Sequence, residues 1–118
     1  MPYVDGFVIA VPTANKDAYR EVAEKMAPVF RDFGATQIVE CWGDDVPDGE
    51  VTSFPMAVKA KDDETVVFSW IVWPDKATRD AAYPAFMEDE RMKDFAPEKM
   101  PFDGKRMILG GFDMIIDA

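Results

Sequence analysis

Short apolar runs alternate along the chain with segments in which apolar residues recur every three or four positions. The first run, residues 4–11, is rich in valine and isoleucine and predicts a buried strand that ends at Pro12. We expect Asn15 to begin a helix whose apolar positions continue until Gly34 ends it. Pro28 lies inside this helix and predicts a kink, because proline lacks the N–H group and crowds the preceding turn.

The remaining elements follow from the same patterns. Residues 36–43 and 65–73 predict the second and third strands, and residues 106–116 predict the fourth. Asp75 is expected to cap a second main helix, which contains Pro84.

Two shorter segments complete the prediction. Residues 53–60 alternate as a strand does, but Ser53 followed by Pro55 is typical of a helix start, and we expect a short helix there. A helical turn is expected over residues 91–95.

The order β-α-β-β-α-β predicts an α+β fold of the ferredoxin-like type, with a four-stranded antiparallel sheet in one domain, residues 1–118. Both main helices then cover one face of the sheet and leave the other face open. An open apolar face of this kind usually binds a partner, and a symmetric homodimer through the sheet face is the simplest one. By strand alternation, we expect this face to carry Tyr3, Asp5, Phe7, Ile9, Ile38, Glu40, Trp42, Ser69, Ile71, Trp73, Arg106 and Ile108.

The charge balance argues against several partners. The chain has 23 acidic and 13 basic residues and a net charge of −10. Nucleic acids and anionic membranes attract basic surfaces, so we expect neither as a partner, and RNA binding is the least favoured function. A single cysteine cannot form an internal disulfide, and the N-terminal residues do not resemble a signal peptide, so we expect a cytoplasmic protein.

The single cysteine is Cys41, in "IVECWG". A catalytic thiol usually needs a neighbouring base or cation, but the chain has no histidine and the adjacent residue is the acid Glu40. We expect Cys41 to share the helix-covered face with Val39 and to pack as a core residue. The following "GDDVPDGE" lacks the alternating spacing of a calcium loop and predicts a solvated turn, so we expect no metal and no cofactor.

The strongest candidate site combines Asp5, Glu40 and Arg106, which the predicted alternation places on one apolar face. In a functional interpretation, Arg106 binds an anionic or carbonyl group and Glu40 or Asp5 acts as a base. The walls of this pocket would be Trp42, Trp73, Tyr3 and Phe7. In a structural interpretation, which we favour, the three charges form an ion-pair network.

Five blocks together resemble one small bacterial family, domain of unknown function 1428: "YVDGFVIAVP", "IVECWGDDVPDGEVTSF", "ETVVFSWIVWP", "RDAAYPAFMEDERM" and "MPFDGKRMILGGF". The resemblance covers essentially the whole chain. It implies a dimeric α+β barrel, a fold group that includes cofactor-independent monooxygenases, haem-degrading enzymes, dehydratases and isomerases. Fold alone does not select an activity.

Two functions therefore stay open. The barrel could bind a small carbonyl or anionic ligand, with a cofactor-independent oxidoreductase or isomerase-like activity. Alternatively, the protein is a non-catalytic structural or stress-related interaction protein whose barrel is filled by side chains.

Overall fold

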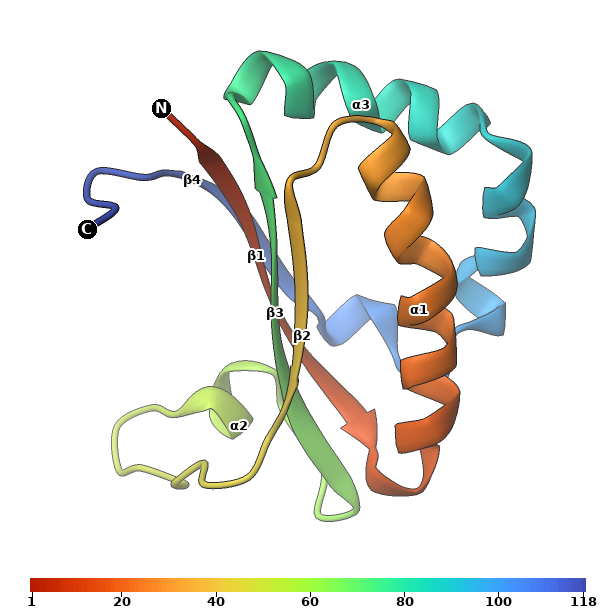
Figure 1. The fold of residues 1–118 in the computed structure, drawn as a ribbon. Coiled ribbons are helices and arrows are strands. Elements are labelled where there is room, and N and C mark those ends of the chain that lie inside the picture. The colour runs from red at the N-terminus through yellow and green to blue at the C-terminus, as the bar shows by residue number, and fades with distance from the viewer.

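A computed structural model describes residues 1–118, and Figure 1 shows its course. Three 3₁₀ segments, Glu90–Phe95, Pro97–Lys99 and Gly104–Arg106, connect the last helix to the last strand, and a fourth, Thr13–Asn15, follows the first strand. The helices and strands in chain order are β1 (Tyr3–Pro12), α1 (Lys16–Asp32), β2 (Gln37–Trp42), α2 (Phe54–Ala57), β3 (Glu64–Trp73), α3 (Lys76–Glu88) and β4 (Ile108–Asp113).

The four strands form one antiparallel sheet in the order β2-β3-β1-β4. The two ten-residue strands, β1 and β3, lie side by side at its centre, with Tyr3 opposite Trp73 and Pro12 opposite Glu64. This topology confirms the predicted α+β, ferredoxin-like βαββαβ fold. The last strand is shorter than predicted, because Arg106 belongs to a 3₁₀ turn and not to β4.

Local signals in the sequence set the helix ends. The Asp75 carboxylate accepts the Thr78 N–H at 2.7 Å and begins α3, as predicted. Ser53 begins α2 in the same way, so the expected short helix is confirmed. Gly34 follows α1 with φ of +111°, and a Cβ atom there would lie 2.7 Å from the Thr78 methyl group. Only glycine therefore suits the close approach of this turn to α3.

Helices α1 and α3 cover one face of the sheet, and α2 with its loops lies on the other side (Figure 1). The main core forms between the sheet and the two long helices. In one part of it, Tyr3, Ile71 and Trp73 of the strands pack with Ala35 and Ala82.

The predicted assignment of the two sheet faces is wrong. The strand residues expected on the open face, from Tyr3 to Trp73, instead face α1 and α3, whereas Ile108 does lie on the open face. Within β1, β2 and β3, alternation correctly groups the residues that share a face, and only the residue of β4 was assigned to the wrong group. Both groups are apolar, however, and a shift by one position exchanges the faces, so the pattern does not show which group the helices cover.

The face opposite α1 and α3 is apolar and largely uncovered, and we call it the open face. Phe68 and Phe112 are 45% and 59% exposed on it. Helix α2 covers one end, where Phe54 packs edge-on against Phe68 with ring centroids 5.9 Å apart. An exposed apolar sheet face exists as predicted, and its residues include Val4, Val8, Phe68, Trp70, Val72, Ile108 and Phe112.

Candidate functional site

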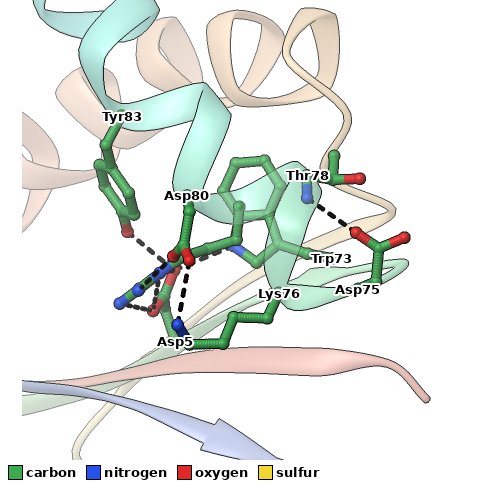
Figure 2. A network of polar contacts seen from close by, with 8 residues as sticks. Asp5, Trp73, Asp75, Lys76, Thr78, Asp80 and Tyr83 are labelled. Carbon is green, nitrogen blue, oxygen red and sulfur yellow. Dashed lines mark hydrogen bonds and ion pairs between the residues drawn. The ribbon is translucent and has the colours of Figure 1, made fainter.

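One polar cluster surrounds the carboxylate of Asp5 (Figure 2). Asp5 lies on β1 and is only 2% exposed. Its carboxylate accepts hydrogen bonds from Trp73 Nε1 at 2.9 Å and from the Tyr83 hydroxyl at 2.7 Å. Arg79 of α3 donates through Nε and forms an ion pair with Asp5 Oδ1 through Nη2 at 2.9 Å.

The Arg79 guanidinium has aromatic as well as acidic neighbours in the Asp5 cluster. The Arg79 guanidinium lies over the rings of Tyr3 and Tyr83, with centroid distances of 5.3 and 5.1 Å. Hydrogen bonding to Asp5 raises the pKa of Arg79, and burial followed by the Asp5 contact raises the pKa of Tyr83. The buried charge is thus paired and fully hydrogen-bonded, which is the arrangement of a structural tie between the sheet and α3.

A second polar group lies between α1 and the edge strand β2. The Tyr19 hydroxyl donates to Glu40 Oε2 at 2.6 Å. Ser69, the partner of Glu40 across the β2–β3 ladder, lies on the same face of the sheet. Glu40 Oε1 has no hydrogen-bond partner within the protein, so this oxygen is free to accept a proton or a hydrogen bond.

Two neighbouring spaces share Glu40 and Tyr19 in their walls. The inner cavity has a volume of about 180 Å³ and lies between α1, the sheet and the segment that precedes β4. The outer hollow has a volume of about 420 Å³ and opens beside β2 and the first turns of α1. Both spaces are lined by Tyr19 and Glu40, and most other walls of the inner cavity are apolar, among them Phe7, Met26, Phe30, Met100, Phe102 and Met107.

Burial changes the proton affinity of both groups. It raises the pKa of Glu40, and the hydrogen bond from Tyr19 partly opposes this rise. Burial, and then the charge of Glu40, raise the pKa of Tyr19, so Tyr19 stays a protonated donor. A carboxylate with a raised pKa is a better proton acceptor than a solvated one, which gives Glu40 the properties of a general base.

The predicted three-residue site does not assemble. Arg106 donates to both carboxylate oxygens of Glu64 at 2.7 Å and also contacts Asp103 at 3.1 Å. It takes this position because the chain has turned away from the sheet before β4 begins. Asp5 and Glu40 do share a face, but β3 separates their strands and each carboxylate has its own partners.

The four predicted aromatic walls divide between the two polar groups. Trp73 and Tyr3 belong to the Asp5 cluster. Phe7 lines the inner cavity, and Trp42 lines the outer hollow.

Cys41 also lies on the face opposite to the predicted one. It is exposed, and its partner across the ladder is Phe68 of the open face. The prediction that Cys41 is a core residue is wrong. Alternation along β2 correctly separated Cys41 from Glu40, but the helices cover the face of Glu40 and not the face of Cys41.

Sequence reasoning missed the helical partners of both carboxylates. Tyr19 fits the helical pattern as one apolar position, although a buried tyrosine hydroxyl needs a hydrogen-bond partner. Arg79 and Tyr83 are four residues apart on α3, a spacing that places both on one side of the helix. These two signals, combined with the acids on the neighbouring strands, could have indicated the pairs.

No group of three or more histidine, cysteine, aspartate and glutamate side chains is arranged to hold a metal ion. No helix has both the length and the apolar composition needed to cross a membrane.

A family model described as a protein of unknown function, DUF1428, matches residues 2–104 of the chain. The chain belongs to this family. Uncharacterized protein YbaA of Escherichia coli K12 is 66% identical over 117 residues, 99% of each chain. YbaA of Shigella flexneri matches with the same identity and coverage.

Two solved structures share the fold of this DUF1428 chain at low sequence identity. A dimeric ferredoxin-like protein from an uncultured marine organism aligns over 100% of both chains with a TM-score of 0.58 and 12% identity. Rv0793 from Mycobacterium tuberculosis aligns over 100% of this chain and 99% of its own, with a TM-score of 0.55 and 10% identity. These likenesses establish the fold, and the function has to be argued from the site.

Proposed function

We propose that the protein binds a small, largely apolar molecule between α1 and the sheet, with Glu40 as the group that accepts a proton or hydrogen bond from it. The observation that carries this proposal is the carboxylate of Glu40 at the junction of two spaces, with Oε2 held by Tyr19 and Oε1 free. Ligand sites commonly combine apolar walls with a few convergent polar groups.

The same arrangement supports proton transfer on the bound molecule. When Oε1 removes a proton from a carbon beside a carbonyl group, the electron pair of the broken C–H bond moves into an enolate and the proton stays on Glu40. The hydrogen bond from Tyr19 fixes the orientation of the carboxylate, and the raised pKa of Glu40 favours proton uptake.

In this proposal the working form is a homodimer joined through the open face. Exposed aromatic side chains such as Phe68 and Phe112 on this face support it, because a patch of this kind is costly to leave in water. A second support is that the ferredoxin-like protein from the marine organism, which has the same fold, is dimeric. In such a dimer the spaces beside Glu40 stay on the outside of the paired sheets.

The test uses benzyl alcohol as a neutral probe, toluene as its analogue without the hydroxyl, and amide chemical shifts as the readout. We expect benzyl alcohol to shift the signals of Tyr19 and Ser69 and to bind more tightly than toluene. Glu40→Leu should remove this preference. Glu21→Leu should keep it, because Glu21 pairs with Lys25 on the outer surface of α1.

Unchanged spectra with both probes would argue against a binding site and for a non-catalytic interaction protein. A circular dichroism spectrum of Glu40→Leu that matches the wild type confirms that the variant is folded.

A further inference from the structure

The outer hollow contains a positively charged side chain with no ion-pair partner. Lys16, the first residue of α1, holds its ammonium group over the ring of Trp42, 5.5 Å from the ring centroid. The other cation of this hollow, Arg20, pairs with Glu24 at 3.0 Å. Lys16 is therefore the cation of this hollow that forms no ion pair.

Lys16 and Glu40 occupy successive positions along one path. Glu40 and Trp42 are two residues apart on β2, so their side chains lie on the same face about 7 Å apart along the strand. Lys16 and Trp42 line the outer hollow but not the inner cavity, whereas Glu40 lines both. The apolar inner cavity follows beyond Glu40.

The size of the inner cavity limits the apolar part of the ligand. An apolar cavity of about 150 Å³ accommodates one benzene molecule. The inner cavity, with about 180 Å³, therefore admits a single six-membered ring or a branched chain of similar volume.

We infer that the ligand is a small hydroxy acid: its ring or branched chain fills the inner cavity, its hydroxyl donates to Glu40 Oε1, and its carboxylate contacts Lys16. This inference rests on the proposed function and specifies the ligand class for the same site. A carboxylate near Glu40 needs a compensating cation, since two like charges at close range oppose each other, and Lys16 is placed to supply it. One ammonium group suits a carboxylate, whereas phosphate groups are usually held by several donors.

Three probes separate the parts of this inference: 3-phenyllactate, its neutral amide, and 3-phenylpropionate, which lacks the hydroxyl. Dissociation constants are measured by chemical-shift titration. We expect 3-phenyllactate to bind about tenfold more tightly than its amide, because one charge-assisted hydrogen bond contributes about this factor to affinity. Lys16→Met should abolish this preference, and its exposed position means that the variant should fold normally. Lys61→Met, which changes a lysine of a different surface hollow, should keep the preference.

Equal affinities of the acid and the amide for the wild type, or an acid preference that survives in Lys16→Met, would overturn the inference and leave the proposed binding site in place. A hydroxyl preference that disappears in Glu40→Leu, without any acid preference in the wild type, would likewise overturn the inference and support the binding site. Failure of all three probes to bind the wild type would overturn both proposals.

Discussion

Glu40 and Cys41 are adjacent in sequence, and their side chains lie on opposite faces of the sheet. Glu40 accepts the hydroxyl hydrogen bond of Tyr19 under α1, and Cys41 is exposed beside Phe68 on the open face. One strand thus contributes to the proposed ligand site with one residue and to the proposed dimer contact with the next. A label on Cys41 can therefore report on the dimer.

The accessibility of Cys41 should depend on the oligomeric state. Because the open face is buried in the proposed dimer, we expect iodoacetamide to modify Cys41 slowly at concentrations that favour the dimer and faster on dilution. Mass spectrometry of timed samples measures the two rates. Equal rates at all concentrations would show that Cys41 lies outside any contact between subunits.

Phe68→Asp should convert the proposed dimer into a monomer. The substitution places a charge within an apolar contact, where it would lose its hydration without gaining a partner. Light scattering after size-exclusion chromatography should give half the wild-type mass. Met87→Asp is the matched control, because Met87 is 75% exposed on α3 and away from the open face; a dimeric Phe68→Asp would contradict the proposed interface.

Asp5→Asn should destabilise the fold strongly. It leaves the Arg79 guanidinium, whose side chain is only 21% exposed, with the more exposed Asp80 as its one remaining counter-charge. Removal of one partner of a buried ion pair typically costs about 3 kcal/mol or more of the free energy of unfolding. Urea denaturation at fixed protein concentration measures the change. Asp80→Asn, which alters exposed pairs of the same helix, should change stability far less.

The ion pair between Glu64 and Arg106 should make stability depend on acid pH. Hydrogen bonds from Arg106 lower the pKa of Glu64 from 4.5 to about 2. A carboxylate with a lowered folded-state pKa stabilises the fold above its unfolded-state pKa, and this contribution is lost as the pH falls from about 4.5 to 2. Thermal unfolding across this window should show a shallower pH dependence for Glu64→Gln than for the wild type. Parallel curves would mean that Glu64 has no lowered pKa.

Tyr19→Phe should raise the pKa of Glu40 further. The Tyr19 hydroxyl donates to the charged carboxylate and so favours ionisation, whereas burial opposes it. Without the hydroxyl only the opposing effect of burial is left, and Glu40 should take up its proton at higher pH. Carbon-detected NMR titration of the glutamate carboxyl signals follows this shift. Tyr83→Phe, whose hydroxyl contacts Asp5, should leave the Glu40 titration unchanged.

The sequence was sufficient for the order and type of the elements, because each depends on local signals. Asp75 and Gly34 mark helix ends through their own backbone and side-chain chemistry, and the alternation of β1 and β3 shows which residues share a face. Choosing the buried face requires knowing where the helices pack. Helix packing depends on contacts between segments that are distant in sequence, and the alternation within one strand carries no information about them.

The candidate site was predicted only in part for the same reason. The sequence singled out Glu40 on the same face as Asp5, but its partner Tyr19 lies on a helix, and the distance of Tyr19 from β2 is set by tertiary packing. Arg106 was misplaced because the sequence pattern of β4 begins earlier than the strand itself. A shift of a few residues at a strand end was enough to remove a cation from the expected site.

The strand order also determines when the chain can fold during synthesis. β1 emerges first from the ribosome, yet both of its neighbours come late: β3 ends at Trp73 and β4 at Asp113. The newly made first strand, with its valines and isoleucine, therefore has no hydrogen-bonding neighbour until more than half of the chain has been translated. The central part of the sheet forms through contacts between residues far apart in sequence, and such contacts slow folding. Until then, the apolar side chains of this nascent segment have no sheet partner to cover them.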